Sequence, residues 1–203
     1  MSDAKDDRPV FLIIAGPNGS GKSSAYQGPD ARAIDRLPRI INPDLLSSRI
    51  REVEGFDPAK ANLRAVQRIE SWLETSILAA QSVGVETVLS TPKYRRLVSL
   101  AKDLGFEIRL SYVLLETPQL NVARVRQRVE QGGHSVPEDK IVARYTRSLE
   151  QLPWFLGQAD RGWIYDNSGT KPRLICRKSE GIIVLDDDAL PQIVAIVRAM
   201  SGE

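Results

Sequence analysis

The feature that most constrains this chain is a glycine-rich loop at residues 16–23, with the sequence Gly-Pro-Asn-Gly-Ser-Gly-Lys-Ser. The loop matches the phosphate-binding pattern G-x-x-x-x-G-K-[ST] at every fixed position. An apolar, β-branched run at residues 10–15 precedes it directly, which predicts a strand buried on both faces. After such a strand, the N–H groups of the loop can point at phosphate oxygens, and the N-terminus of the next helix adds its dipole. The motif therefore predicts a site for a nucleotide triphosphate rather than a chance glycine-rich turn.

The loop residues have different expected roles in this site. Lys22 is expected to reach the β- and γ-phosphates as a point charge, and the Ser23 hydroxyl to bind Mg²⁺. His134 is the single histidine of the chain, and it is expected to be either a cap or a further phosphate contact. The complete set predicted to bind ATP is Gly16, Pro17, Asn18, Gly19, Ser20, Gly21, Lys22, Ser23, Ser24 and His134.

Predicted strands alternate with predicted helices through most of the chain. Strands are expected at residues 10–15, 39–42, 85–90, 107–115, 163–166, 173–177 and 182–185. Helices are expected at residues 57–83, 94–104, 118–131, 137–156 and 190–200. Gly84 is expected to end the first of these helices, and its apolar face should hold Leu63, Val66, Ile69, Leu73, Ile77 and Leu78. This order predicts an α/β fold of the P-loop NTPase, kinase-like type, with three layers, a mostly parallel sheet, an antiparallel pair at its edge and a helical lid.

Length and composition narrow the function classes further. A chain of 203 residues fits one domain, expected over residues 1–203. Twenty-eight basic residues against 26 acidic ones give a net charge of +2, which offers no reason to expect nucleic-acid binding. The polar N-terminus and the short apolar runs predict neither a signal peptide nor a membrane span. A single cysteine, Cys176, excludes an intramolecular disulfide and favours a cytoplasmic setting, where Cys176 and the three tryptophans serve as packing residues.

Two large classes of P-loop proteins lack support in the sequence. The guanine-reading Asn-Lys-x-Asp of GTPases and the Leu-Ser-Gly-Gly-Gln of transporter ATPases are both missing. Residues 166–169 match the loose Asp-x-x-Gly pattern, but a turn is the simpler interpretation. A strict Walker B strand is not evident either, which small kinases tolerate because phosphoryl transfer depends mostly on positioning and charge neutralisation.

Two carboxylates are candidates for the acceptor side of such a kinase. Asp44 follows the second predicted strand, so it is expected at the same sheet edge as the phosphate loop, where it could activate a hydroxyl. An equally supported alternative is that Asp44 caps a helix beginning at Leu45. Glu86 lies in an otherwise apolar strand, which requires a ligand, a partner such as an arginine, or a place at the strand's mouth. We favour a substrate-binding role for Glu86 and its neighbour Thr87.

Residues 124–147 form the predicted lid, a helix, a Gly-Gly-His-Ser-Val-Pro turn and a second helix. Six basic residues oppose three acidic ones over this stretch. Arginines on a mobile lid could close over the triphosphate and neutralise the charge that develops during transfer. The arginines of this stretch are Arg124, Arg126, Arg128, Arg144 and Arg147, of which Arg124 and Arg128 share a helix face and Arg126 points elsewhere. For any single arginine a solvated helix face is the simpler interpretation, and the lid role is predicted for the cluster as a whole.

Several motifs together resemble the zeta-toxin family of P-loop kinases, over roughly residues 11–168. They are the phosphate loop, then Ile-Asn-Pro-Asp at 41–44, Val-Glu-Thr-Val-Leu-Ser at 85–90, Arg-Val-Glu-Gln-Gly-Gly-His-Ser-Val-Pro at 128–137 and Ile-Val-Ala-Arg-Tyr-Thr-Arg-Ser at 141–148. The last two look most like the zeta-like predicted-ATPase branch of the family.

The resemblance implies ATP-dependent phosphorylation of a UDP-activated amino sugar, chiefly UDP-N-acetylglucosamine, and any antitoxin partner would be a separate protein. It implies that Asp44 is the catalytic base, that Glu86 binds the substrate, and that Lys22 and Arg128 bind phosphate. The second lid arginine of the family has no secure counterpart, and His134 or Arg144 could take its place. A nucleoside, nucleotide or other small-metabolite kinase is the alternative enzyme, and an ATP-dependent regulatory or binding module is the alternative of another class.

Overall fold

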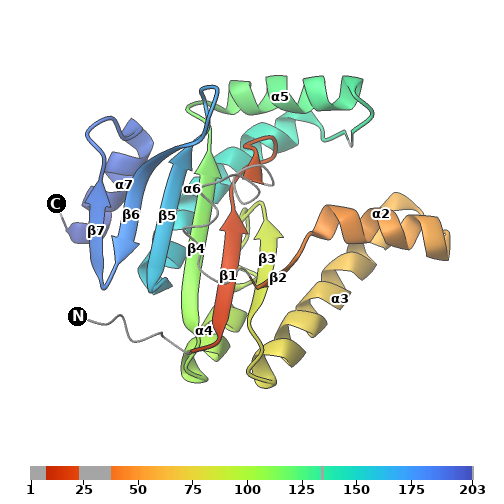
Figure 1. Cartoon of the computed structure of the whole chain (residues 1–203). Coiled ribbons are helices and arrows are strands. Elements are labelled where there is room, and N and C mark those ends of the chain that lie inside the picture. The colour runs from red at the N-terminus through yellow and green to blue at the C-terminus, as the bar shows by residue number, and fades with distance from the viewer. Residues whose placement is uncertain (1–7, 23–37, 134, 203) are drawn as a thin grey trace.

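One sheet of seven strands organises the computed structural model, which describes residues 8–22, 38–133 and 135–202 (Figure 1). The order across the sheet is β2-β3-β1-β4-β5-β6-β7. The strands are β1 (Val10–Ala15), β2 (Arg39–Ile41), β3 (Val83–Thr87), β4 (Glu107–Leu114), β5 (Arg161–Asp166), β6 (Arg173–Ser179) and β7 (Ile182–Leu185). The first five strands in this order are parallel, whereas β6 and β7 pair antiparallel at one edge. The predicted mostly parallel sheet with an antiparallel edge is confirmed.

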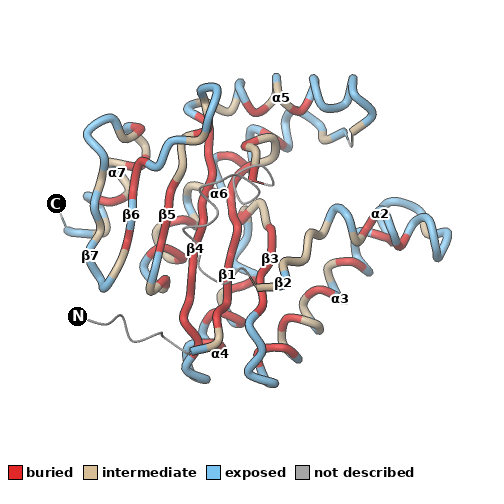
Figure 2. Tube along the Cα trace, in the orientation of Figure 1, coloured by how far each residue is buried: buried red, intermediate tan, exposed pale blue. Residues whose placement is uncertain are grey.

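Four of the described helices pack on one face of this sheet. The described helices are α2 (Pro43–Glu54), α3 (Pro58–Leu78), α4 (Arg95–Asp103), α5 (Pro118–Glu130), α6 (Glu138–Gln158) and α7 (Pro191–Ser201). Apolar side chains of α3, α4, α6 and α7 join those of the strands in one large core, and β1 and β4 are buried along their whole length (Figure 2). The opposite face of β1 presents Val10, Leu12 and Ile14. Within the described part of the chain, no helix combines the length and the apolar character needed to cross a bilayer.

The predicted helix over residues 57–83 is too long at its C-terminal end. Helix α3 ends at Leu78, because Ala80 adopts a left-handed conformation with φ of 54° and the chain turns there. Gly84 does not end a helix but lies inside β3, where a Cβ atom would come within 3.0 Å of the Ile40 side chain. Leu63 and Leu78 are 59% and 65% exposed, so the predicted apolar face was wrong at both positions. Small residues of the same helix face the interior in their place, among them Ala61 and Ala65.

The other predicted elements agree with the structure more closely. Apart from β3, which spans Val83–Thr87 where residues 85–90 were predicted, the remaining bounds differ from the structure by at most two residues. Cys176 is buried, as predicted. The tryptophans also pack as expected: Trp163 is buried, Trp72 packs partly buried against the main core, and Trp154 lies edge-on against Phe155.

Candidate functional site

The phosphate loop follows β1, where the strand order reverses, with β3 and β2 on one side of β1 and β4 and β5 on the other. Strand β1 lies between β3 and β4, and crevices for ligands form at such switch points. Gly16 has φ of 142°, and a Cβ atom there would lie 1.9 Å from the Val113 carbonyl oxygen. Gly21 has φ of 86°, and its Cβ would lie 2.3 Å from Nδ2 of Asn167. Glycine is required at both positions because the loop bends sharply and lies directly against the sheet.

Two buried amide side chains hold the loop from outside. Asn121 of α5 donates from Nδ2 to the Asn18 carbonyl at 2.6 Å, and Asn167 donates from Nδ2 to the Ser20 carbonyl at 2.8 Å. Arg124 in turn donates to the Asn167 carbonyl at 2.7 Å. Asn121 carries no signal in the sequence, where residues 166–169 predict only a turn. The position of that turn after a strand, at the same sheet edge as the loop, is the signal that could have identified Asn167.

Lys22 is buried at the end of the loop. Its ammonium group donates to the carbonyls of Gly16 at 2.8 Å and Pro17 at 3.0 Å. Burial lowers the pKa of Lys22 below 10.5, while the negative charges of Glu86 and Asp44 oppose this effect. Lys22 is therefore a desolvated cation close to two carboxylates, and phosphate oxygens can replace the carbonyl acceptors. The predicted ligands Ser23, Ser24 and His134 lie outside the described residues.

Asn42 connects the two predicted acceptor carboxylates. Its Oδ1 accepts from the backbone N–H groups of Asp44 at 2.8 Å and Leu45 at 3.3 Å, so Asn42 is the N-cap of α2. The alternative that Asp44 caps this helix is therefore wrong, because the helix begins one residue before it at Pro43. The Nδ2 of Asn42 donates to Oε2 of Glu86 at 2.8 Å. Glu86 is 8% exposed, at the end of β3 that is nearest the phosphate loop.

A cleft of about 550 Å³ joins these groups in one place. Its walls come from the phosphate loop, the start of α2, one side of α3, the segment after β3 and the start of α6. Among the predicted site residues, the cleft brings together Asn18, Gly19, Lys22, Asp44, Glu86, Thr87, Arg128 and Arg144. Further lining residues that the sequence analysis did not identify include Asn42, Asn62, Lys93 and Lys140.

The arginines of the predicted lid separate into two groups. Arg128 and Arg144 line the cleft, and Nη1 of Arg144 lies 3.3 Å from Oδ1 of Asn18 in the phosphate loop. Arg124 instead supports Asn167, Arg126 forms an exposed ion pair with Glu138 at 2.6 Å, and Arg147 donates to a carbonyl of its own helix. Arg128 and Arg144, the two arginines predicted to act on phosphate, are thus the lid arginines that line the cleft among the described residues.

The double glycine after α5 sets the path of the chain back toward the cleft. Gly132 is left-handed with φ of 85° and donates to the Val129 carbonyl, while Gly133 donates to the Arg128 carbonyl. These two bonds satisfy the last carbonyls of α5 in the pattern that ends many helices. A Cβ on Gly133 would lie 2.6 Å from Cγ of Arg128, so the turn and the arginine pack directly on each other.

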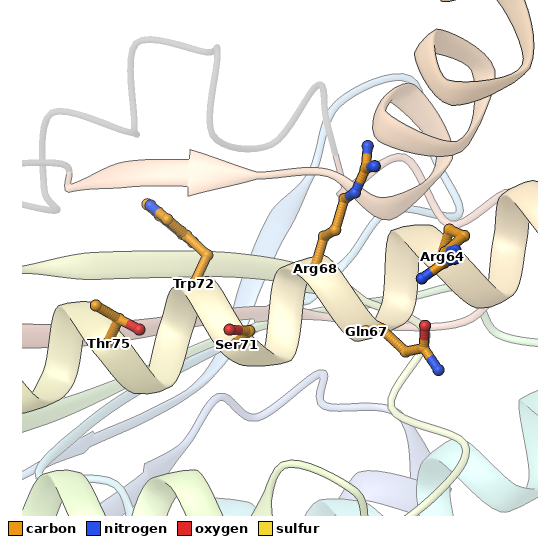
Figure 3. Close-up of a pocket in the computed structure, with 6 residues that line it drawn as sticks. All are labelled: Arg64, Gln67, Arg68, Ser71, Trp72 and Thr75. Carbon is orange, nitrogen blue, oxygen red and sulfur yellow. The ribbon is translucent and has the colours of Figure 1, made fainter. Parts of the chain in front are cut away.

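A separate hollow of about 390 Å³ lies on the outer side of α3 (Figure 3). Arg68 and Trp72 project from the same side of the helix, and Arg68 forms a two-pronged hydrogen bond to Glu54 of α2. This hollow shares no residue with the cleft at the phosphate loop. The ion pair gives Arg68 a structural role in holding α2 against α3.

Comparison with protein families identifies the central part of the chain. Residues 11–152 match the model of a family described as an AAA domain. An uncharacterized protein of Haemophilus influenzae is 27% identical over 134 residues, which cover 66% of this chain and 91% of that protein.

Solved structures with the same fold include two protein complexes. A chain from the complex of AvrRxo1-ORF1 with AvrRxo1-ORF2 superposes with a TM-score of 0.68 at 16% identity, covering 89% of the present chain. The present chain spans only 62% of that longer chain, which has also been solved in a complex with ATP. A chain from the PezAT chromosomal toxin-antitoxin system of Streptococcus pneumoniae has a TM-score of 0.65 at 18% identity, with 97% of this chain and 86% of that chain covered. At these identities the similarity establishes the P-loop NTPase fold of the kinase-like type.

Proposed function

This chain belongs to the AAA domain family, and we propose that it is a Mg²⁺-ATP-dependent kinase that phosphorylates a hydroxyl group of a small molecule. The observation that carries the proposal is the single cleft that holds Lys22, Asp44 and Glu86 with Arg128 and Arg144. A buried cation beside the loop, two carboxylates and two further cations are the groups that phosphoryl transfer to a hydroxyl requires. A reaction that consumes ATP also suits the cytoplasmic setting expected from the sequence.

The loop residues fit a bound triphosphate. Gly16 and Gly21 leave no room for a Cβ on the sheet side, and the loop carbonyls that Lys22 now contacts are weaker partners than phosphate oxygens. Lys22, Gly19 and Asn18 would hold the phosphates, with Arg128 and Arg144 closing over them from the lid. By its place in the motif, Ser23 would bind Mg²⁺, which neutralises the phosphates and polarises the group to be transferred.

The proposed acceptor is a UDP-activated amino sugar such as UDP-N-acetylglucosamine, as in the zeta-toxin family. Asp44 would orient the acceptor hydroxyl and take its proton, and Glu86 with Thr87 would bind the sugar. The motifs that resemble this family support the acceptor, and the toxin-antitoxin system among the proteins of the same fold supports a separate antitoxin partner.

Mass spectrometry of the reaction products tests this function. The purified chain would be incubated with Mg²⁺-ATP and either UDP-N-acetylglucosamine or a set of nucleosides and nucleotides. We expect a product 80 Da heavier than the sugar nucleotide, about 10²- to 10⁴-fold slower formation with Asp44→Asn, and nearly unchanged ATP binding in that variant. If only nucleosides are phosphorylated, the proposed sugar-nucleotide acceptor is wrong. Retained turnover in Asp44→Asn would refute the role of Asp44 as the base. No phosphorylated product with any acceptor would favour a regulatory module.

Expression in cells tests the toxin interpretation separately. Induction of the wild-type chain is expected to stop growth and cause lysis, because consumption of the sugar nucleotide starves cell-wall synthesis. The Lys22→Ala variant is expected to be harmless at the same expression level. Equal growth of both strains would contradict toxicity while leaving the kinase activity to be judged by its products.

A further inference from the structure

Asn42 and Asp57 begin consecutive helices in the same way. Each lies before a proline, each has an extended backbone, and each accepts two backbone hydrogen bonds on Oδ1. Asn42 accepts from residues 44 and 45 at 2.8 and 3.3 Å, and Asp57 from residues 59 and 60 at 3.0 and 3.1 Å. The chain therefore contains two matched caps that differ chiefly in one group, an amide in one and a carboxylate in the other.

For capping alone, a carboxylate would serve α2 at least as well as an amide does. A negative charge interacts favourably with the positive end of the helix dipole, and the backbone bonds at the cap of α3 hold the pKa of Asp57 below its ordinary value. Asn42 forgoes this charge. What the amide supplies is a donor, and its Nδ2 gives a hydrogen bond of 2.8 Å to Oε2 of Glu86, 44 residues away.

The same amide also fixes where Asp44 lies. Asp44 is the second residue of α2, and its backbone N–H is one of the two groups that Oδ1 of Asn42 accepts. Asn42 thus reaches Glu86 with one end of its amide and the start of the helix that carries Asp44 with the other. Both carboxylates line the cleft, and both act on the charge of Lys22.

A neutral donor is the suitable choice at this position. An aspartate would place a second negative charge at hydrogen-bond distance from Glu86, and a basic residue would neutralise the Glu86 charge. An amide orients the Glu86 carboxylate through a hydrogen bond and adds no charge of its own. We infer that Asn42 is a positioning residue, which sets the separation and orientation of Glu86 and Asp44 around the acceptor hydroxyl. The kinetic consequence of this inference rests on the proposed kinase function.

Matched substitutions at the two caps separate positioning from capping. Asn42→Ser keeps an oxygen that caps the helix but removes the donor to Glu86, and Asp57→Ser is its control on α3. With Mg²⁺-ATP and UDP-N-acetylglucosamine, we expect kcat of Asn42→Ser to fall about 10- to 100-fold while the KM for ATP is unchanged, since a hydrogen bond to a charged group is lost. Asp57→Ser should keep the wild-type kcat.

Asn42→Asp provides a readout that a purely structural role would not change. Two carboxylates at hydrogen-bond distance do not both ionise easily, so the acid limb of the kcat pH profile should move to higher pH by about one unit or more. The control Asp57→Asn should leave the profile where it is. An unchanged kcat in Asn42→Ser, or an equal loss in Asp57→Ser, would overturn the inference.

Chemical unfolding keeps the inference testable even if the proposed function fails. The urea midpoints of Asn42→Ser, Glu86→Ala and the double variant form a thermodynamic cycle that needs no activity, because each single variant removes the hydrogen bond. Non-additive midpoints are expected because the two side chains share a hydrogen bond, and additive midpoints would overturn the inference. Absence of any phosphorylated product from the wild-type chain would refute the kinase proposal alone.

Discussion

A buried lysine lies at each end of the strands, Lys22 at their carboxyl ends and Lys178 at the opposite end, but the two lysines donate to different kinds of carbonyl group. Lys22, at the carboxyl ends of the parallel strands, donates to two successive carbonyls of its own loop at 2.8 and 3.0 Å. Lys178, at the opposite end, donates to two successive carbonyls of α6 at 2.8 Å each. Helix carbonyls near a C-terminus need such donors, whereas the carbonyls of a phosphate loop lie where a ligand binds. The same bonding pattern therefore satisfies helix carbonyls at one end and lies within the phosphate loop at the other.

The two ends of the strands also each hold a buried glutamate, and the two glutamates have different kinds of donor as partners. Glu107 is 1% exposed and lies 2.7 Å from Nη2 of Arg109 and 2.9 Å from Nε of Arg161. Glu86 receives its hydrogen bond from the neutral amide of Asn42 and lines the cleft. A carboxylate between two guanidinium groups has its charge balanced within the fold. The amide adds no charge of its own beside Glu86, whereas two guanidinium groups surround Glu107.

Substitution of each lysine by alanine should give the largest difference between the two ends of the strands. Lys22→Ala is expected to lower kcat/KM for ATP about 10³-fold or more, because the phosphates lose their buried cation. Lys178→Ala is expected to lower the free energy of unfolding by about 1–3 kcal/mol, because two helix carbonyls lose their donor, and to keep wild-type kinetics. Steady-state assays and urea unfolding of both variants measure the two effects. Equal kinetic losses would show that the ends of the sheet are not functionally distinct.

Glutamine at the two glutamates should sharpen the comparison further. Glu86→Gln keeps the shape of the side chain but loses its charge, so kcat/KM for the acceptor should fall about 10- to 100-fold with little change in stability. Glu107→Gln removes the negative charge that faces the buried Arg109 and the partly exposed Arg161, and breaking the buried pair should cost about 3–5 kcal/mol of unfolding free energy. A stable Glu107→Gln protein, or a Glu86→Gln protein with unchanged acceptor kinetics, would contradict the assignment.

Local sequence signals were sufficient for the loop and for most of the fold. The apolar run at residues 10–15 and the glycine pattern after it define a buried strand and its turn without any distant contact. The rule that parallel strands end at one edge also predicted Asp44 beside the loop, and an isolated carboxylate in an apolar strand pointed to Glu86; both line the same cleft. These predictions depend on periodicity and chain direction, which the sequence encodes directly.

Contacts between distant segments could not be predicted in the same way. Asn121 and Asn167 support the loop from positions 103 and 147 residues away from the carbonyls that they contact, and asparagine is ordinary in helices and turns. Glycine often ends a helix, and this general preference led to the wrong prediction for Gly84. Gly84 lies within a strand, where close packing against Ile40 requires glycine. Helical spacing separates Arg126 from Arg124 and Arg128, but the packing of α5 on α6 decides that Arg128 and Arg144 line the cleft.

The alkaline pH dependence of ATP binding offers a smaller test of the same contrast. Burial lowers the pKa of Lys22 while Glu86 and Asp44 oppose that shift, so the ammonium loses its proton below pH 10.5. ATP affinity should fall as pH rises through this lowered pKa, by up to about tenfold per pH unit, and the fall should begin at lower pH in Glu86→Gln. Over the same window the unfolded chain binds more protons than the folded chain, so Lys22 makes stability rise with pH. Calorimetric titration with ATP measures the affinity. Burial also lowers the pKa of Lys178, but this lysine lies at the other end of the sheet, so Lys178→Ala should leave the pH dependence of ATP affinity unchanged.

Cys176 provides the smallest effect and a control for all of these variants. Its thiol is buried within β6, and burial raises its pKa to about 11. At pH 8 the thiolate fraction is therefore on the order of 10⁻³, so a thiol reagent should label the folded chain slowly and the urea-unfolded chain within minutes. Variants at the phosphate-loop end should keep this protection, because their changes lie outside the core. Glu107→Gln should label faster, since loss of the buried ion pair raises the population of open states. Rapid labelling of the folded wild-type chain would show that the β6 core is less protected than its burial indicates.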